Sequence, residues 1–285
     1  MPRDFRFYST TPSAPLDTAV EMILCAKGLI PGEMETILPH GKVALGLNLG
    51  GPHRFGKHAT EQHNPCFRES WFTGLQTSPL YHHPPATTHV HGIIFDPLAF
   101  SEMFPQNMTT WRDSTANAFD VLGSRFGGRL LTLCRQHADV DAVHQAIEGQ
   151  LLSRFNERKR HPIWLWQGYG QIWKRQGRLG LEHLYQRLEV SGRHFTQTFQ
   201  AAVGVSPKAL CRVLRLNAVL AAVDPGRELN WSHLAHEADY SDQSHFNRDF
   251  MHFTGMTPGQ YIEARLAGYG QLQPGQDISF VPDIG

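Results

Sequence analysis

The sequence lacks the features that would place the protein in a membrane or give it a strong overall charge. Its 26 lysines and arginines balance 26 aspartates and glutamates, so the total charge indicates no nucleic-acid partner and any basic character must be local. No stretch approaches the ~18 apolar residues of a membrane span, and the first residues, MPRDFRFYST, lack the apolar core of a signal peptide. We therefore expect a soluble, cytoplasmic protein with no membrane partner.

Cysteine is also scarce, and the motifs of the common enzyme classes are missing. The 4 cysteines (Cys25, Cys66, Cys134 and Cys211) contain no C-x-x-C pair, which argues against a zinc site or a disulfide framework and favours reduced thiols. There is no nucleophile elbow, Gly-rich phosphate loop, HExxH motif or pair of carboxylates at catalytic spacing. The sequence therefore predicts no enzyme, no catalytic residue and no cofactor.

The first half of the chain has the pattern of a β-rich domain. Residues Lys42–Leu49 alternate apolar side chains on one face and end in a Gly-Gly-Pro turn signal. Phe67–Leu75 and His89–Phe95 are further strand candidates bounded by Pro, Gly or Asn. Several short strands with this punctuation predict a barrel or sandwich-like domain.

Beyond Pro97 the apolar period becomes helical. Leu98–Phe104 predicts a short helix and Val140–Phe155 a longer one, and the polar run Asn156–Pro162 marks a domain boundary. From Ile163 onward we expect helices and no strand, at Ile163–Arg175, Leu181–Leu188, Ser191–Val203, Pro207–Val223, Trp231–Ala238, Asp242–Thr254 and Pro258–Leu266. The predicted fold class is α+β, with a β-rich domain at residues 1–160 that also carries helices, an all-α domain at 161–268 and a C-terminal tail at 269–285.

The all-α part contains an internal repeat with an offset of 51 residues (Phe250 minus Phe199). The string Ser191-x3-Phe195-x3-Phe199-x4-Gly204-x-Ser206-Pro207-x2-Leu210 matches Asp242-x3-Phe246-x3-Phe250-x4-Gly255-x-Thr257-Pro258-x2-Tyr261. Each matched position has a physical role: a helix N-cap, two inward aromatic rings, a left-handed stop, and a new start with proline in the first turn. A short helix precedes each copy, so the sequence predicts two helix-turn-helix units.

Residues 163–265 resemble the DNA-binding domain of the AraC-type regulators. The resemblance is carried by Gly204-Val205-Ser206-Pro207, by Arg215-Leu216-Asn217-Ala218 and by Asp242-Gln243-Ser244-His245-Phe246 through Tyr261. Residues 19–150 resemble, more loosely, a sensory region of some AraC-type proteins, with Pro39-His40-Gly41 and Gly92-Ile93-Ile94-Phe95-Asp96-Pro97. The resemblance implies a transcription regulator that binds double-stranded DNA through two successive major grooves. It also implies a small-molecule effector at the first domain, with RNA polymerase and a second copy of the chain as candidate partners.

The outward face of each second helix supplies the predicted DNA contacts. These are Arg193, Thr196, Gln197 and Gln200 in the first unit and Gln243, Ser244, Asn247 and Arg248 in the second, side chains suited to base edges. On the helix between the units, Lys208 and Arg212 are predicted phosphate contacts and Arg215 a structural bond. The family often has arginine where this chain has Gln197, and glycines where it has Glu189 and Asp239, so we expect the first unit to bind more weakly.

The histidines leave one further alternative. His82, His83, His89 and His91 lie close together in the sequence, and His89 and His91 would share one face of a strand. The candidates for further ligands (Asp96, His53 and His58) have no persuasive spacing, so no metal site is predicted. The alternative function is a cupin-like metal-dependent enzyme fused to a DNA-binding module, and a third hypothesis is a regulator without an effector.

Overall fold

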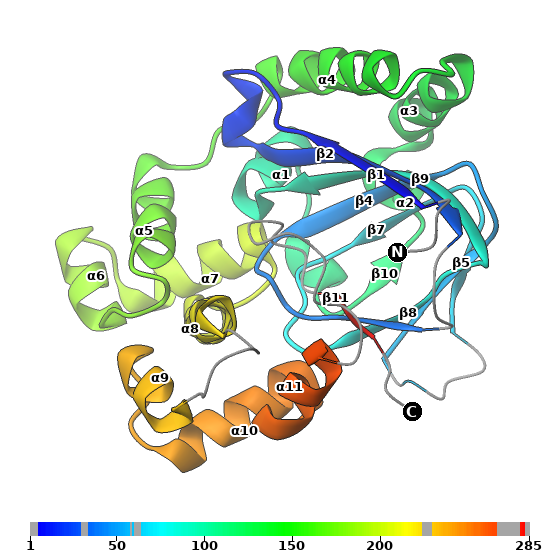
Figure 1. Ribbon diagram of the computed structural model, residues 1–285. Helices are drawn as coiled ribbons and strands as arrows, with labels where there is room; N and C mark the ends of the chain where they lie inside the picture. Colours follow the sequence, from blue (N-terminus) through cyan, green and yellow to red (C-terminus); the bar gives the residue numbers. More distant parts are fainter. Residues whose placement is uncertain are drawn as a thin grey trace.

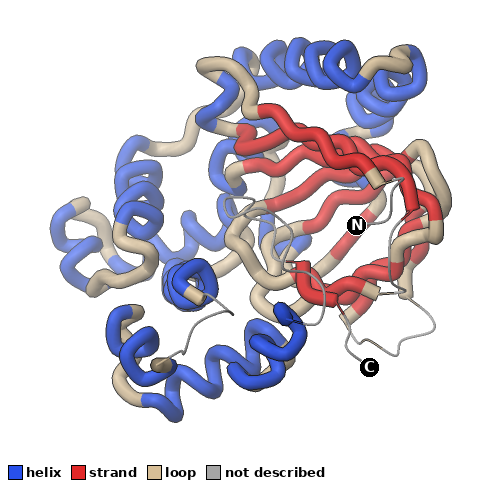
Figure 2. Tube along the Cα trace, in the orientation of Figure 1, coloured by secondary structure: helices blue, strands red, loops and turns tan. Residues whose placement is uncertain are grey.

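The computed structural model describes residues 5–29, 34–57, 59, 64–223, 230–266 and 280–282. Its first half forms two antiparallel sheets that face each other, and its second half is a group of helices beside them (Figures 1 and 2). The expected α+β class is therefore confirmed. The β-rich part is sandwich-like, because neither sheet closes into a barrel.

The larger sheet has six strands in the order β1-β2-β9-β4-β7-β10. They span Arg6–Thr10, Val20–Leu29, Thr87–Phe95, Val43–Asn48, Ser70–Thr73 and Thr115–Ala116, respectively. The smaller sheet has five strands in the order β11-β3-β8-β5-β6, at Phe280–Pro282, Glu35–Ile37, Leu80–His83, His53–Gly56 and Cys66–Phe67. A cluster of apolar residues that includes Phe55, Trp71 and Val90 is buried in the first half.

Helices cover the face of the larger sheet that is turned away from the smaller sheet (Figure 1). They are α1 (Pro97–Met103), α3 (Ser124–Gln136) and α4 (Val140–Asn156), with the short α2 (Ala118–Leu122) before α3 and the 3-10 turns η1 (Leu16–Thr18) and η2 (Met108–Trp111) nearby. Val43, Leu45 and Leu47 are fully buried, as their alternation predicts. The same alternation places His91 and Ile93 of β9 on one face of the sheet.

The helices of the second half lie close to their predicted positions. They are α5 (Ile163–Lys174), α6 (Leu181–Arg187), α7 (Gly192–Val203), α8 (Pro207–Ala222), α9 (Trp231–Glu237), α10 (Gln243–Thr254) and α11 (Pro258–Leu266). The polar run before α5 is a loop, since α4 ends at Asn156. The division of the chain at residue 160 stays a prediction. None of the described helices is both long and apolar enough to cross a membrane.

The expectation that no strand follows Ile163 is wrong. Residues 280–282 form β11, which pairs antiparallel with β3 through Phe280 and Ile37 at one end and Pro282 and Glu35 at the other. Three residues with no apolar alternation around them leave no periodic signal, so only the sheet edge offered by β3 makes them a strand.

Candidate nucleic-acid interface

The internal repeat forms two units of the same shape, α6–α7 and α9–α10. Each second helix begins at its expected cap: Ser191 Oγ accepts from the His194 amide at 3.3 Å, and Asp242 Oδ1 accepts from the His245 amide at 2.7 Å. Each ends at a left-handed glycine, Gly204 with φ of 99° and Gly255 with φ of 72°. Both are therefore helices of 12 residues with well-defined ends.

The turn before each second helix contains a strained non-glycine residue. Glu189 has φ of 54° and Asp239 has φ of 60°. A side chain at positive φ costs free energy, less for Asp than for most residues. The carbonyl of Asp239 accepts a hydrogen bond from Arg215 Nη1 at 3.1 Å, which confirms the structural bond predicted for Arg215.

The paired phenylalanines point into the protein. Phe195 and Phe199 of α7, and Phe246 and Phe250 of α10, have no exposed surface. The rings of Phe195 and Phe199 stack, with centroids 5.6 Å apart, and those of Phe246 and Phe250 meet edge to face at 5.5 Å. The face of each helix opposite these rings is therefore the one turned to solvent.

That outward face differs between the units. In α10 all the predicted contacts (Gln243, Ser244, Asn247 and Arg248) are exposed. In α7 Arg193 and Gln197 are exposed, whereas Thr196 and Gln200 are half-buried. Helix α7 also packs against α1 and η2 of the first half. A ligand as large as DNA therefore has freer access to α10.

Helix α8 joins the two units, and its arginines hold the second unit in place. Arg212 donates from Nε and Nη2 to the two carboxylate oxygens of Asp249, at 3.2 and 2.6 Å, and its guanidinium lies over the ring of Phe253. Asp249 is almost fully buried, and its hydrogen bonds are the main reason that the pKa of Arg212 is raised. Arg212 therefore forms an internal ion pair, and its predicted phosphate contact stays a prediction. Lys208, in the first turn of α8, is exposed.

The segment between β3 and β4 packs against the helical half. Leu38 is fully buried in the core cluster of the second unit, beside Val213 and Leu216 of α8. Gly41 has φ of 81°, and a Cβ there would lie 3.2 Å from the ring of Trp173 in α5. Residues Leu38–Gly41 therefore contact α5 and the second unit together.

An ionic cluster lies beside this segment. Lys42 Nζ is 3.0 Å from Glu21 Oε2 and 3.8 Å from Asp96 Oδ2, and it lies 4.1 Å from the ring centroid of Trp173. The hydroxyl of Tyr169, in α5, donates to Asp96 Oδ2 at 2.6 Å. Burial raises the pKa of Asp96, and Lys42 opposes that shift. The motifs quoted for the sensory region, Pro39-His40-Gly41 and the run ending in Asp96-Pro97, therefore meet at the contact with α5.

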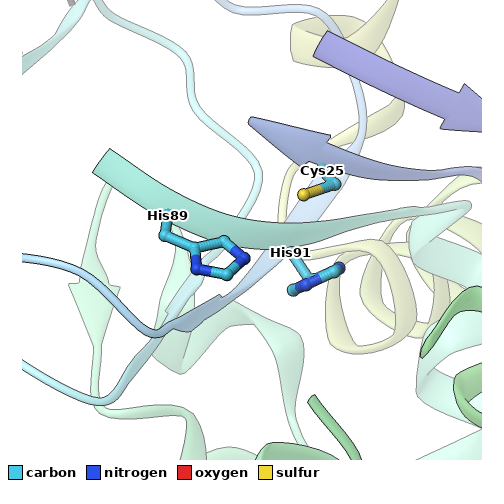
Figure 3. Close-up of side chains that lie close together, drawn as sticks. All are labelled: Cys25, His89 and His91. Carbon is cyan, nitrogen blue, oxygen red and sulfur yellow. The ribbon is translucent and has the colours of Figure 1, made fainter. Parts of the chain in front are cut away.

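The four clustered histidines separate into two places. His82 belongs to the smaller sheet, where its Nδ1 is 2.9 Å from Glu35 Oε2 and its Nε2 is 2.8 Å from His53 Nδ1. His89 and His91 lie on β9 beside Cys25 of β2 (Figure 3). The expectation that His89 and His91 share a face is confirmed. His83 Nε2 is buried without a partner among the described residues, and His58 lies outside them.

Comparisons with known proteins match two separate stretches of the chain. Residues 184–264 match a family described as a helix-turn-helix domain, and residues 8–117 match a domain of unknown function, DUF6597. No curated protein matches the sequence.

Similar arrangements occur among solved structures. One is ToxT from Vibrio cholerae, at 8% identity over 92% of this chain and 98% of that chain, with a TM-score of 0.47. Another is ToxT of Vibrio cholerae O395 bound to (E)-4-(8-methylnaphthalen-1-yl)but-3-enoic acid, at 8% identity over 92% and 99%, with a TM-score of 0.47. A third is the AraC-like transcriptional activator CuxR, at 13% identity over 77% and 88%, with a TM-score of 0.30.

Proposed function

We propose that this chain is a DNA-binding transcription regulator of the AraC type and that its two helix-turn-helix units contact two successive major grooves of one operator. The observation that carries the proposal is the duplicated second helix, with phenylalanines buried on one face and polar side chains exposed on the other. Arginine pairs with guanine, Asn and Gln pair with adenine, and hydroxyls bond to either, so both outward faces suit base edges.

The helix between the units supports simultaneous binding. Helix α8 has 16 residues and is therefore about 24 Å long at 1.5 Å per residue. The ion pair of Arg212 with Asp249 fixes α10 on α8, so the units cannot turn independently. Two recognition helices about one DNA turn apart, ~34 Å, match the two half-sites of one face of the duplex. Lys208 is the proposed phosphate contact on this helix.

We expect the two units to contribute unequally to DNA recognition. The second unit exposes its complete set, Gln243, Ser244, Asn247 and Arg248. The first exposes Arg193 and Gln197 but half-buries Thr196 and Gln200, and the Glu189 carboxylate lies in the turn before its recognition helix. We therefore assign most of the sequence specificity to the second unit.

We also propose that the first half of the chain binds an effector and mediates self-association. The segment Leu38–Lys42 supports this, because it contacts α5 and the second unit and so connects the sheets to the DNA-binding helices. The cupin-like enzyme is not favoured, because neither sheet closes into a barrel, and we propose that the chain is not an enzyme. A cytoplasmic location and contact with RNA polymerase follow from a regulator's task and are proposed with it.

Footprinting with purified full-length protein tests the DNA contacts. Arg248→Ala and Gln243→Ala should each weaken operator binding by about 5- to 150-fold, because one good contact to a base contributes roughly 1–3 kcal/mol. The matched control is Arg129→Ala, an exposed arginine of α3 far from both recognition helices, which should leave the footprint intact. Unchanged footprints in both α10 variants would remove that helix from the interface.

A further inference from the structure

The face of the larger sheet under α3 and α4 brings a thiol and imidazoles together. Strands β2 and β9 pair antiparallel with Cys25 opposite His91, and His89 follows two residues away on the same face. One ligand atom from each of the three side chains lies within 4.8 Å of the others (Figure 3). Cys25 is far from His89 and His91 in the sequence and meets them only through the register of the sheet.

The burial of this group is not compensated by hydrogen bonds. Cys25 and His91 are about 1% exposed or less, and His91 Nδ1 has no hydrogen-bond partner among the described residues. A buried imidazole nitrogen without a partner destabilises the fold, so a group that satisfies it would stabilise the protein. The unpartnered nitrogen belongs to the same cluster as the thiol.

Helix α4 adds another imidazole to the same place. The ring of His144 lies edge-on to that of His91, with centroids 5.7 Å apart. Thr10 Oγ1 is 3.1 Å from His144 Nδ1, while His144 Nε2 is buried without a partner among the described residues. A hydrogen bond to one ring nitrogen orients the other, which is the usual arrangement around a metal-ligating histidine.

We propose that Cys25, His89, His91 and His144 form a binding site for one thiophilic metal ion, Zn²⁺ or Cu⁺. One thiolate and three imidazoles are ligands that these ions prefer, in tetrahedral or trigonal geometry, whereas Mg²⁺ and Ca²⁺ require oxygen ligands that this group lacks. The inference rests on the proposed function, because it assigns a metal ion as the effector of the first half of the chain.

Metal entry at this cluster releases a proton. Cys25 binds as the thiolate, so its proton passes to solvent, and the histidines bind as neutral imidazoles.

A route from solvent exists at His89. This side chain is half-buried and lines a surface cavity of about 360 Å³, together with Cys134, His137 and the two arginines Arg68 and Arg135. An ion can therefore reach His89 first and move inward to Cys25 and His91. Because His144 lies on α4 and the others on the sheet, a bound ion would link that helix to β2 and β9.

Metal titration of the full-length, chelator-treated protein tests the site. Zn²⁺ and Cu⁺ are titrated separately against a chromophoric chelator, Cu⁺ under anaerobic reducing conditions, and one ion per chain is expected for at least one of them. Co²⁺ in place of Zn²⁺ should give a thiolate-to-cobalt charge-transfer band. This band reports Cys25 in the unmutated protein, so the test does not depend on whether a variant folds.

Variants then assign the ligands. Cys25→Ser should abolish the cobalt band and His91→Gln should greatly weaken binding. Thr10→Val should weaken binding by about 10-fold, the usual size of an effect from an orienting partner. Cys66→Ser and His233→Gln change exposed side chains elsewhere and should bind metal like the unmutated protein.

Two results would overturn the site: no stoichiometric binding of either ion, or equal binding by Cys25→Ser, His91→Gln and the unmutated protein. Operator binding is measured separately, with and without bound metal. Absence of operator binding in both states would count against the DNA contacts and not against the metal site, so the two failures can be told apart.

Discussion

At the level of single residues, the ion pair of Arg212 and Asp249 holds the second unit on α8. Asp249→Ala leaves the guanidinium without its bidentate partner, and breaking a buried pair costs about 3–5 kcal/mol. Because about a third of the Arg212 side chain is exposed, we expect a smaller loss, about 2 kcal/mol in the free energy of unfolding. Urea denaturation measures it.

The companion measurement is operator binding. Asp249→Ala should also weaken the footprint at the second half-site, although Asp249 is buried and cannot contact DNA. A variant that loses no stability would show that Arg212 is free to contact phosphate, as the sequence alone predicted.

His53 makes the stability of the protein depend on pH. Burial, helped by His82, lowers the pKa of His53 to about 3, below the value of 6.5 expected in an unfolded chain. The unfolded state therefore binds more protons between these values, and stability falls as the pH falls below about 6.5. Between pH 7 and pH 5 the free energy of unfolding of the unmutated protein should fall by about 2 kcal/mol more than that of the His53→Gln variant. Denaturant unfolding at both pH values checks this, and parallel losses would contradict it.

At the level of elements, the turn at Gly41 positions the segment that packs on α5. Gly41→Ala introduces a Cβ at positive φ, 3.2 Å from the ring of Trp173, and should destabilise the protein by about 1–2 kcal/mol. The control is Gly128→Ala in α3, where nothing lies within 4 Å and the helix should gain about 0.5–1 kcal/mol. The midpoint of thermal unfolding should therefore fall for Gly41→Ala and rise for Gly128→Ala. Shifts of the same sign would contradict the role given to Gly41.

The turn before α7 offers a gain of function. Glu189→Gly relieves the positive φ and removes a carboxylate from the proposed DNA side, so it should both stabilise the first unit and strengthen binding at the first half-site. Glu189→Gln keeps the strain but removes the charge. Footprint titrations of both variants separate the two causes. Weaker binding by Glu189→Gly would contradict the role given to this turn.

The helical half could be predicted from the sequence because its signals are local. Caps, left-handed glycines and a helical period fix each end, and the repeat doubles every signal, so α5 to α11 match their predicted ranges closely. The strands were harder. β2 contains the apolar run of residues 22–26, which shows no alternation, and β3, β5 and β8 are short. Helix α3 is amphipathic, so its period was available in the sequence and the helix is a missed prediction.

The candidate DNA interface and the cysteine–histidine cluster were predictable only in part, because the sequence pattern reports on single elements and not on how elements pack together. Exposure of the α10 contacts follows from their phase relative to Phe246 and Phe250. Asp249 as the partner of Arg212, and Cys25 as the neighbour of His91, depend on helix packing and strand register. No pattern within one element contains that information.

At the level of the whole molecule, the first half and both units share packed surfaces. One core cluster runs from the sheets through α1 to Phe195 and Phe199, and the second cluster includes Leu38. An effector that moves the sheets relative to α4 or to the Leu38–Lys42 segment can therefore change how the recognition helices are held.

The charge of the DNA-binding half predicts a moderate salt dependence. Residues 162–265 contain eleven Lys or Arg and nine Asp or Glu, and Arg212 is neutralised internally. Because few phosphate contacts are expected, the logarithm of the binding constant should fall against the logarithm of salt with a slope clearly shallower than about −9, the value for ten contacts. Equilibrium binding at several salt concentrations measures the slope. A value near −9 or steeper would mean contacts that the structure does not provide.

The central claim is that two recognition helices, held by α8, contact two major grooves on one face of DNA. The most direct test is to measure operator affinity after insertions between the half-sites. About 5 bp turns the second half-site to the opposite face of the duplex and should reduce binding to that of a single unit. Replacement of one half-site without any insertion should give the same reduced affinity. Undiminished binding after the 5-bp insertion would contradict the claim, because the units would then be independent.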